Sequence, residues 1–344
     1  METISQILAR ELGRSVEHVD NVIALLDEGN TLPFIARYRK ERHGSMDDTI
    51  LRALQERLQY LRGLEQRRQE VKSAIENQGK LTEELSATID AAATLAEVED
   101  LYRPYKQKRR TRATAAREKG LEPLAELLYA QERGCPDPLT AAADYVAPEK
   151  GVETAEEALQ GASDIVAEVI SDDAAVRKLL REQLMARGFL TSSAAGEEDS
   201  VYRLYYDFRQ PLGRLQGHQI LAINRGEREG FLKVTVENDR EGALISLRRQ
   251  VVRPSSPAMA FVRPPAEDAY DRPIFPSLER EARGALTDQA NEGAIGQFAL
   301  NLRPLLMQPP VKGHVTMGLD PGYRMGCKVA VVDATGKVLD TAVV

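Results

Sequence analysis

Apolar residues recur every three or four positions through the first 190 residues, which is the spacing of one face of an α-helix. The longest such pattern runs from Asp47 to about Asn77 and predicts one long amphipathic helix that ends at Gly79. Short polar side chains suited to cap helix N-termini precede several other patterns: Ser15, Thr82, Thr154 and either Asp172 or Asp173. The hydrophobic pattern therefore predicts a multi-helical region over residues 1–190.

The first two predicted helices are short and are separated by a tight turn. Residues 4–12 share one apolar face that Gly13 ends, and a second apolar face begins after Ser15 and ends near Gly29. Such a pair resembles a helix-turn-helix. We favour the alternative, a plain helical hairpin, because the second helix is acidic and would repel the phosphates of a nucleic acid.

The pattern changes after the helical region. Residues 191–200 are small and polar and predict a loop. Residues 201–208 and 231–237 are rich in β-branched and aromatic side chains and predict two strands, with a helix between them near residues 218–224. Helical spacing returns over residues 276–307. This part of the chain is therefore predicted to be a helical continuation with a small β insertion.

Three short strands are predicted near the C-terminus, over residues 314–320, 327–333 and 337–344. A three-stranded sheet with no later helix is not a finished domain, so we expect the chain to be a piece of a longer protein. The predicted fold class is mainly α, with a small β insertion and the first strands of a truncated α/β domain. The predicted domains are residues 1–190, 191–312 and 313–344.

Composition limits the classes of protein to consider. The sequence is 42% apolar and 29% charged, as is usual for a folded soluble protein. It has no apolar run of the ~20 residues that a membrane helix needs and no signal sequence, so we expect a cytoplasmic protein with no membrane partner. Cys135 and Cys327 lie far apart and only 4 histidines are present, so we expect no disulfide, no metal centre and no cofactor.

The formal net charge of −7 is unevenly distributed along the chain. Residues 121–200 hold 6 basic and 17 acidic side chains, a charge of −11, whereas residues 1–120 carry +1 and residues 201–344 carry +3. Local charge, more than the total, decides where a polyanion docks. The basic segments of the flanking regions are therefore the candidates for nucleic-acid contact.

The strongest basic segment follows a pair of tyrosines and Pro104. Five cations fall within seven residues: Lys106, Lys108, Arg109, Arg110 and Arg112. Cations on an extended segment can follow the phosphates of a single strand, and Tyr105 could stack on a base. The alternative is a solvated loop, or a loop that is held against the acidic residues 121–200.

A second basic segment, residues 32–41, is a weaker candidate. Arg37, Arg39 and Lys40 follow an apolar anchor and could also contact phosphates. The alternative is a helix that packs through Phe34, Ile35 and Tyr38 and is polar elsewhere.

One further segment could support chemistry. A predicted strand ends at Asp320 and turns through Pro321 and Gly322. Ribonuclease H-like nucleases begin in this way, with the aspartate holding a divalent metal, and so do actin-like ATPases, whose turn cradles a phosphate. A tight β-turn is the alternative. A nuclease would also need carboxylates from later elements, so Asp320 is a weak catalytic candidate.

Four segments resemble the bacterial Tex transcription accessory proteins. They are LPFIARYRKE, VEDLYRPYKQKRRTRAT, AREKGLEPLAELL and GLDPGYRMGCKVAVVD, and the similarity extends from about Ile4 to Val344. The resemblance implies a mainly helical region over residues 1–310 and the first strands of a YqgF-type ribonuclease H-like domain over residues 313–344. Family members continue with helix-hairpin-helix elements and an oligonucleotide-binding barrel.

The resemblance also implies a function. It indicates a non-catalytic transcription accessory protein that binds RNA or DNA, with RNA polymerase as a further candidate partner. Asp320 matches the position of the first metal-binding aspartate of Holliday-junction resolvases. Two alternatives therefore stay open: a metal-dependent nuclease of that class, and a protein-docking scaffold that uses the acidic residues 121–200.

Overall fold

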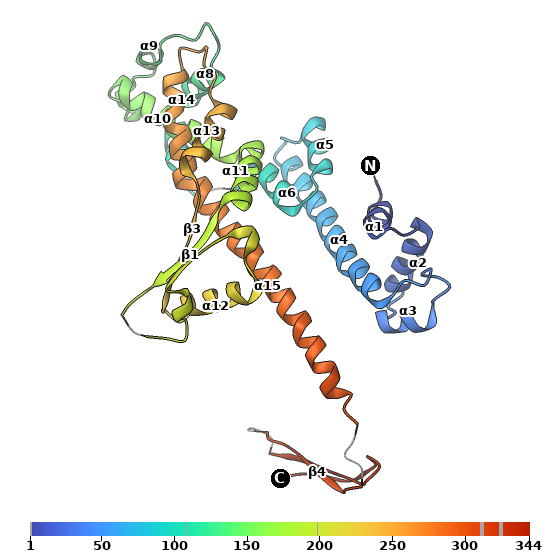
Figure 1. Ribbon diagram of the computed structural model, residues 1–344. Helices are drawn as coiled ribbons and strands as arrows, with labels where there is room; N and C mark the ends of the chain where they lie inside the picture. The colour runs from blue at the N-terminus through green and yellow to red at the C-terminus, as the bar shows by residue number, and fades with distance from the viewer. Residues whose placement is uncertain (1, 108, 198, 310–312, 323–325) are drawn as a thin grey trace. The chain divides into compact units, whose positions relative to one another are not determined.

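The computed structural model describes residues 2–107, 109–197, 199–309, 313–322 and 326–344. The fold is mainly helical with two small sheets, which confirms the predicted fold class (Figure 1). The helices are α1 (Ile4–Leu12), α2 (Val16–Asp27), α3 (Leu32–Tyr38), α4 (Asp48–Glu76), α5 (Glu83–Ala91), α6 (Leu95–Tyr102), α7 (Arg112–Glu118), α8 (Glu122–Ala130), α9 (Pro138–Ala143), α10 (Ala155–Asp172), α11 (Ala174–Arg187), α12 (Gly217–Arg228), α13 (Arg240–Val251), α14 (Met259–Ala269) and α15 (Phe275–Leu306). The strands are β1 (Phe189–Ala194), β2 (Asp207–Pro211), β3 (Leu232–Glu237), β4 (Thr316–Asp320), β5 (Lys328–Val332) and β6 (Val338–Val343).

The predicted helix starts of the first half are confirmed. Asp47 caps α4 by accepting a hydrogen bond from the Ile50 backbone N–H at 2.8 Å. The four predicted caps accept the same type of bond: Ser15, Thr82, Thr154 and, of the two aspartates offered for α11, Asp173. Gly13 ends α1 in the left-handed conformation, with φ of 62°. None of the described helices combines the length and the apolar character that crossing a lipid bilayer would require.

The chain forms two compact units, and each is built from two separate stretches of sequence. The first unit comprises Met1–Gly188 and Asn238–Leu278, and the second comprises Phe189–Glu237 and Glu279–Val344. Helices α13 and α14 therefore belong with the N-terminal helices, although the β1–β3 insertion separates them in sequence.

In the first unit, α4 contributes to two successive hydrophobic clusters. Its first half, through Leu51 and Leu54, packs with α1, α2 and α3. Its second half, through Val71 and Ile75, packs with α5 and α6. All four of these side chains are fully buried, so one long helix holds both groups of short helices together.

Helix α10 is the centre of the other part of this unit. It contacts α7, α8, α9 and α14, and its Ile165, Val166 and Ile170 side chains are buried. Gly161 lets α8 approach closely, since a Cβ atom there would lie 2.3 Å from the Leu121 side chain. Helix α10 also packs against α7, which places Glu168 next to Thr111 at the start of α7.

In the second unit, β1 is the central strand of an antiparallel sheet with the order β2-β1-β3. The predicted loop over residues 191–200 is therefore wrong at its start, because residues 191–193 pair with both neighbouring strands and Ala194 pairs with β3. The small polar side chains of β1 do not show the alternation of apolar and polar residues by which a strand is predicted from sequence. Ser192 is buried, and its hydroxyl donates a hydrogen bond to the Tyr205 carbonyl at 2.7 Å.

The strand predicted over residues 201–208 is also largely wrong. Residues Arg203–Tyr205 form a 3-10 helix, and β2 begins only at Asp207. The aromatic side chains pack elsewhere: the Tyr202 ring lies 6.0 Å from that of Phe231, and its hydroxyl donates to Glu229 at 2.7 Å. The predicted strand at residues 231–237 is confirmed as β3, and the predicted helix near residues 218–224 is confirmed as α12.

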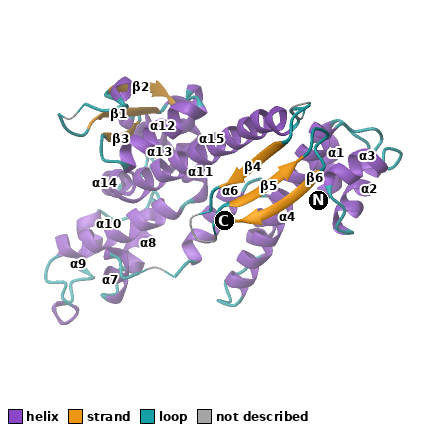
Figure 2. Cartoon of the chain, turned by 90° about the horizontal axis from the view of Figure 1, so that it is seen from below, coloured by secondary structure: helices purple, strands orange, loops and turns teal. Residues whose placement is uncertain are grey.

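The three C-terminal strands are confirmed as an antiparallel sheet with the order β4-β5-β6 (Figure 2). Every side chain of β4 and β6 is exposed, including the apolar Met317, Leu319 and Val343. This sheet therefore has little buried core of its own among the residues that the structure describes.

Candidate nucleic-acid interface

The basic loop, defined here as residues 106–112, connects α6 to α7. Helix α6 ends at Tyr102, and a short 3-10 turn that contains Pro104 follows. Proline has no N–H to continue a helix, so the chain leaves α6 at this point. Thr111 then caps α7, since its hydroxyl accepts a hydrogen bond from the Thr114 N–H at 3.0 Å. Lys106, Arg109 and Arg110 thus lie on the connection between the two helices, and Arg112 is the first residue of α7.

The tyrosines beside the basic loop anchor it to the core. Tyr102 and Tyr105 pack against the cluster that includes Val71 and Ile75. The Gln78 side-chain amide donates a hydrogen bond to the Tyr105 carbonyl at 3.0 Å. Tyr105 is therefore half-buried, and only part of its ring is available for the predicted stacking on a base.

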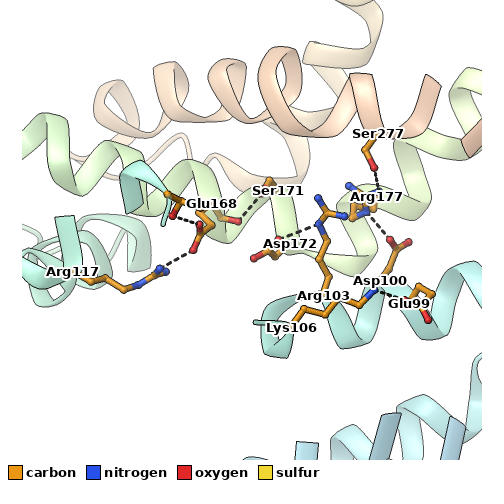
Figure 3. A network of polar contacts seen from close by, with 11 residues as sticks. Glu99, Asp100, Arg103, Lys106, Arg117, Glu168, Ser171, Asp172, Arg177 and Ser277 are labelled. Carbon is orange, nitrogen blue, oxygen red and sulfur yellow. Dashed lines mark hydrogen bonds and ion pairs between the residues drawn. The ribbon is translucent and has the colours of Figure 1, made fainter. Parts of the chain in front are cut away.

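Lys106 is engaged within the protein. Its ammonium group pairs with the Glu99 carboxylate (Figure 3). The same group lies 5.3 Å from the centre of the Tyr102 ring. Arg67 binds the same carboxylate at 2.6 Å. Burial raises the pKa of Glu99, but the hydrogen bonds from Arg67 and Lys106 outweigh it and hold this pKa below its usual value. The carboxylate stays ionised at neutral pH, so Lys106 is already neutralised.

The other described cations of the basic loop, Arg109, Arg110 and Arg112, are exposed. Arg109 and Arg112 are exposed and form no ion pair with any residue that the structure describes. Arg110 binds Glu118 at 2.9 Å, but both side chains are more than half exposed, so a competing phosphate could replace that carboxylate. Lys108 lies outside the described residues. Arg109, Arg110 and Arg112 are thus the described cations best able to contact a polyanion.

Acidic residues of α10 hold the base of the basic loop (Figure 3). The Thr111 hydroxyl donates to Glu168 at 2.9 Å, and Arg117 binds the same carboxylate at 2.7 Å. On the other side, Arg103 binds Asp172 at 3.2 Å. Part of the acidic residues 121–200 therefore neutralises cations beside the loop.

A buried ion-pair network lies next to this anchor, and sequence reasoning missed it. Asp100 accepts a hydrogen bond from Arg177 at 2.6 Å, and Arg177 also donates to the Ser277 hydroxyl at 3.1 Å (Figure 3). Arg181 donates a hydrogen bond to the other Asp100 carboxylate oxygen at 2.5 Å. Burial lowers the pKa of Arg177, although Asp100 opposes that shift. Helical spacing could have predicted the buried position of Arg177. It precedes Leu180 and Leu184 by three and seven positions, so the three side chains lie on one face of the helix.

The basic loop and α10 line a pocket of about 370 Å³. Its charged lining residues have both signs: Arg103, Lys106, Arg112 and Arg272 are basic, and Asp164, Glu168 and Asp172 are acidic. Burial raises the pKa of Asp164, with Arg112 and Arg272 opposing that shift. Arg112 lines the pocket and is also exposed, whereas Arg109 and Arg110 are exposed and do not line it. Because the lining is mixed, the exposed part of the loop is a better phosphate site than the pocket.

The second basic segment lies at the end of α3. Arg37 and Lys40 are exposed, and Arg39 is half-buried with its guanidinium 5.2 Å from the centre of the Phe34 ring. None of these three cations forms an ion pair within the described part of the chain. Ile35 is fully buried, as the packing alternative predicts, but Tyr38 is 57% exposed, so that alternative is wrong for this ring.

Asp320 lies at the end of β4, opposite Lys328 in the register of the sheet. Its side chain is exposed. In the described ranges, no three His, Cys, Asp or Glu side chains come together in a group that could hold a metal ion. Asp320 therefore belongs to no group of three or more such ligands among those residues.

Three family models match the chain in order. They are the Tex-like protein N-terminal domain over residues 2–76, the Tex central region-like model over residues 135–298 and the Tex protein YqgF-like domain over residues 314–344. The helical region and the C-terminal sheet thus correspond to successive parts of one domain series. The chain belongs to the Tex family.

Relatives agree with this assignment. The chain is 46% identical over 100% of its length to the uncharacterized protein YdcI of Bacillus subtilis, and it covers 49% of that protein. It is 41% identical over 99% of its length to the transcriptional accessory protein Tex of Neisseria gonorrhoeae and covers 46% of it. It is 33% identical over 94% of its length to the human S1 RNA-binding domain-containing protein 1 and covers 34% of it. The chain spans about half the length of the bacterial relatives.

Proposed function

We propose that this chain is the nucleic-acid-binding N-terminal and central part of a cytoplasmic transcription accessory protein, with RNA or DNA as its ligand. Arg109, Arg110 and Arg112 are the proposed phosphate contacts. The observation that carries the proposal is that Arg109 and Arg112 are exposed without an ion pair to a described residue, although carboxylates neutralise Lys106, Arg103 and Arg117 close by. The printed names of two relatives, a transcriptional accessory protein and an S1 RNA-binding domain protein, support the same class of ligand.

The salt dependence of binding tests the basic loop. Three phosphate contacts to a single strand correspond to a log–log slope of about −2, at ~0.7 per contact. Replacing Arg109 and Arg112 by alanine should make the slope shallower by about 1.4. The acidic residues 121–200 repel the same polyanion, so we expect a parent Kd on the order of 10⁻⁵ M or weaker near physiological salt. The measurement is an anisotropy titration with labelled single-stranded oligonucleotides at several salt concentrations.

A matched variant controls for net charge. Arg133→Ala with Lys150→Ala removes two exposed cations outside the basic loop and should leave the slope unchanged. Oligonucleotides of equal length and different sequence should bind alike, because phosphate contacts do not read sequence. If the Arg109 and Arg112 variant keeps the parent slope, the basic loop is not the binding surface. Retention on RNA polymerase without any on nucleic acid would favour the scaffold alternative instead.

We also propose that the chain has no nuclease activity. Two-metal cleavage needs several carboxylates around ions ~4 Å apart, and Asp320 has no such partners among the described residues. Labelled single-stranded, duplex and four-way DNA should stay intact with magnesium or manganese. Cleavage that follows the purified protein and disappears in Asp320→Asn would establish the nuclease alternative.

A further inference from the structure

An exposed aromatic and cationic surface lies at the C-terminal end of α3. We call it the α3 patch, and its members are Phe34, Arg37, Tyr38, Arg39 and Lys40. The Tyr38 ring is 57% exposed and lies 5.3 Å from the Phe34 ring, with an angle of 44° between their planes. The Arg39 guanidinium lies over Phe34, 5.2 Å from its centre. The patch thus presents a supported aromatic ring beside three cations.

The α3 patch is held firmly in place. Leu32 and Ile35, from the opposite side of α3, are buried in the cluster formed with α2 and α4. The turn after the patch is fixed as well, because the Asn21 side chain donates a hydrogen bond to the Arg42 carbonyl at 3.1 Å. The exposed position of Tyr38 is therefore a property of the folded helix, and a ligand meets a preorganised surface.

The charge of the α3 patch differs from that of the neighbouring helix. Cations along α4 are paired with carboxylates: Arg52, Arg57, Arg62, Arg67, Arg68 and Lys72. By contrast, Arg37, Arg39 and Lys40 form no ion pair with a described residue. Glu41 follows them directly, so the segment from Arg37 to Glu41 still has a formal charge of +2. This surface therefore suits an anionic partner.

We infer that the α3 patch binds single-stranded nucleic acid by stacking an unpaired base on Tyr38 while Arg37 and Lys40 contact the adjacent phosphates. The inference rests on the proposed function and adds to it a second site with a defined ligand class. A strand that alternates flat bases and phosphates matches both the ring and the cations. An acidic peptide would satisfy the cations alone, and the bases of a duplex are already stacked on each other.

Tryptophan fluorescence offers a specific test, since the sequence contains no tryptophan. In Tyr38→Trp, the only indole of the protein reports on this site. A single-stranded oligonucleotide should quench it, whereas an abasic oligonucleotide of equal length and a poly-glutamate peptide should leave the emission nearly unchanged. Tyr145→Trp, at a half-buried tyrosine outside the patch, is the matched control and should show no quenching.

Affinity measurements complete the test. Tyr38→Ala should weaken binding of the single-stranded oligonucleotide by about fivefold or more and leave binding of the abasic strand unchanged, while Tyr38→Phe retains parent affinity. If Tyr38→Ala binds like the parent while the Arg109 and Arg112 variant binds more weakly, this inference is wrong and the proposed function stands. If no variant and no parent protein binds either strand, both are wrong. Quenching by poly-glutamate alone would assign the patch to an acidic protein partner and overturn the inference.

Discussion

Replacing Asp100 by alanine should lower the free energy of unfolding by about 3–5 kcal/mol, because the buried guanidinium of Arg177 loses the carboxylate that it binds. Arg177 is 2% exposed and Asp100 is 4% exposed, so water cannot solvate the remaining charge. One Arg177 nitrogen already lacks a hydrogen-bond partner among the described atoms, which makes further loss costly. Urea unfolding followed by circular dichroism measures the change.

The matched control for this variant is Glu11→Ala. Glu11 forms a bidentate pair with Arg57 at 2.8 Å, but about a third of each side chain is exposed. Water and salt screen such a pair, so the unfolding midpoint should move far less than in Asp100→Ala. Equal, small shifts in both variants would show that the buried network around Asp100 contributes little to stability.

Amide hydrogen exchange should be roughly 10³-fold faster in the C-terminal sheet than in the buried face of α4. Leu51, Leu54 and Leu58 of α4 are at most 4% exposed, so their amides should open only when the whole unit unfolds, at about 5 kcal/mol or more. Side chains of β4 and β6 are exposed throughout, so opening of that sheet should cost close to nothing. Mass-spectrometric exchange over residues 48–76 and 316–343 gives both rates in one experiment.

The comparison within the same sample serves as the control for pH and temperature. Slow exchange of equal rate in the two segments would mean that the sheet is covered in solution. If a second copy of the chain covers the sheet, tenfold dilution should separate the copies and restore fast exchange.

The ion pairs of Glu97 and Glu99, which lie in the helix before the basic loop, should persist at neutral pH. A hydrogen bond from Lys178 is the main cause that holds the pKa of Glu97 below its usual 4.5, and hydrogen bonds from Arg67 and Lys106 lower that of Glu99 against the effect of burial. A lowered carboxylate pKa adds stability that is complete above pH 4.5 and is lost as the pH falls through the lowered value. Both residues belong to α6, which leads directly into the loop.

Local patterns explain which parts of the fold the sequence predicts well. Helix α4 follows from apolar spacing, and its start follows from Asp47, because a cap needs only a side chain and a backbone N–H three residues away. The strands at residues 316–343 follow from alternation and turn residues. The position of β1 does not, since its polar side chains become a central strand only when two distant segments pair with it.

The candidate site divides in the same way. The sequence by itself determines that residues 106–112 are basic and that Pro104 ends the helix before them, because charge and proline chemistry belong to each residue alone. Only the tertiary structure decides which cations stay available. Lys106 meets Glu99 through the turn after α6, and Tyr105 is covered by the cluster of α4 and α5, whereas Tyr38 remains exposed. Pairing and burial depend on segments far apart in sequence, and no local pattern specifies where those segments meet.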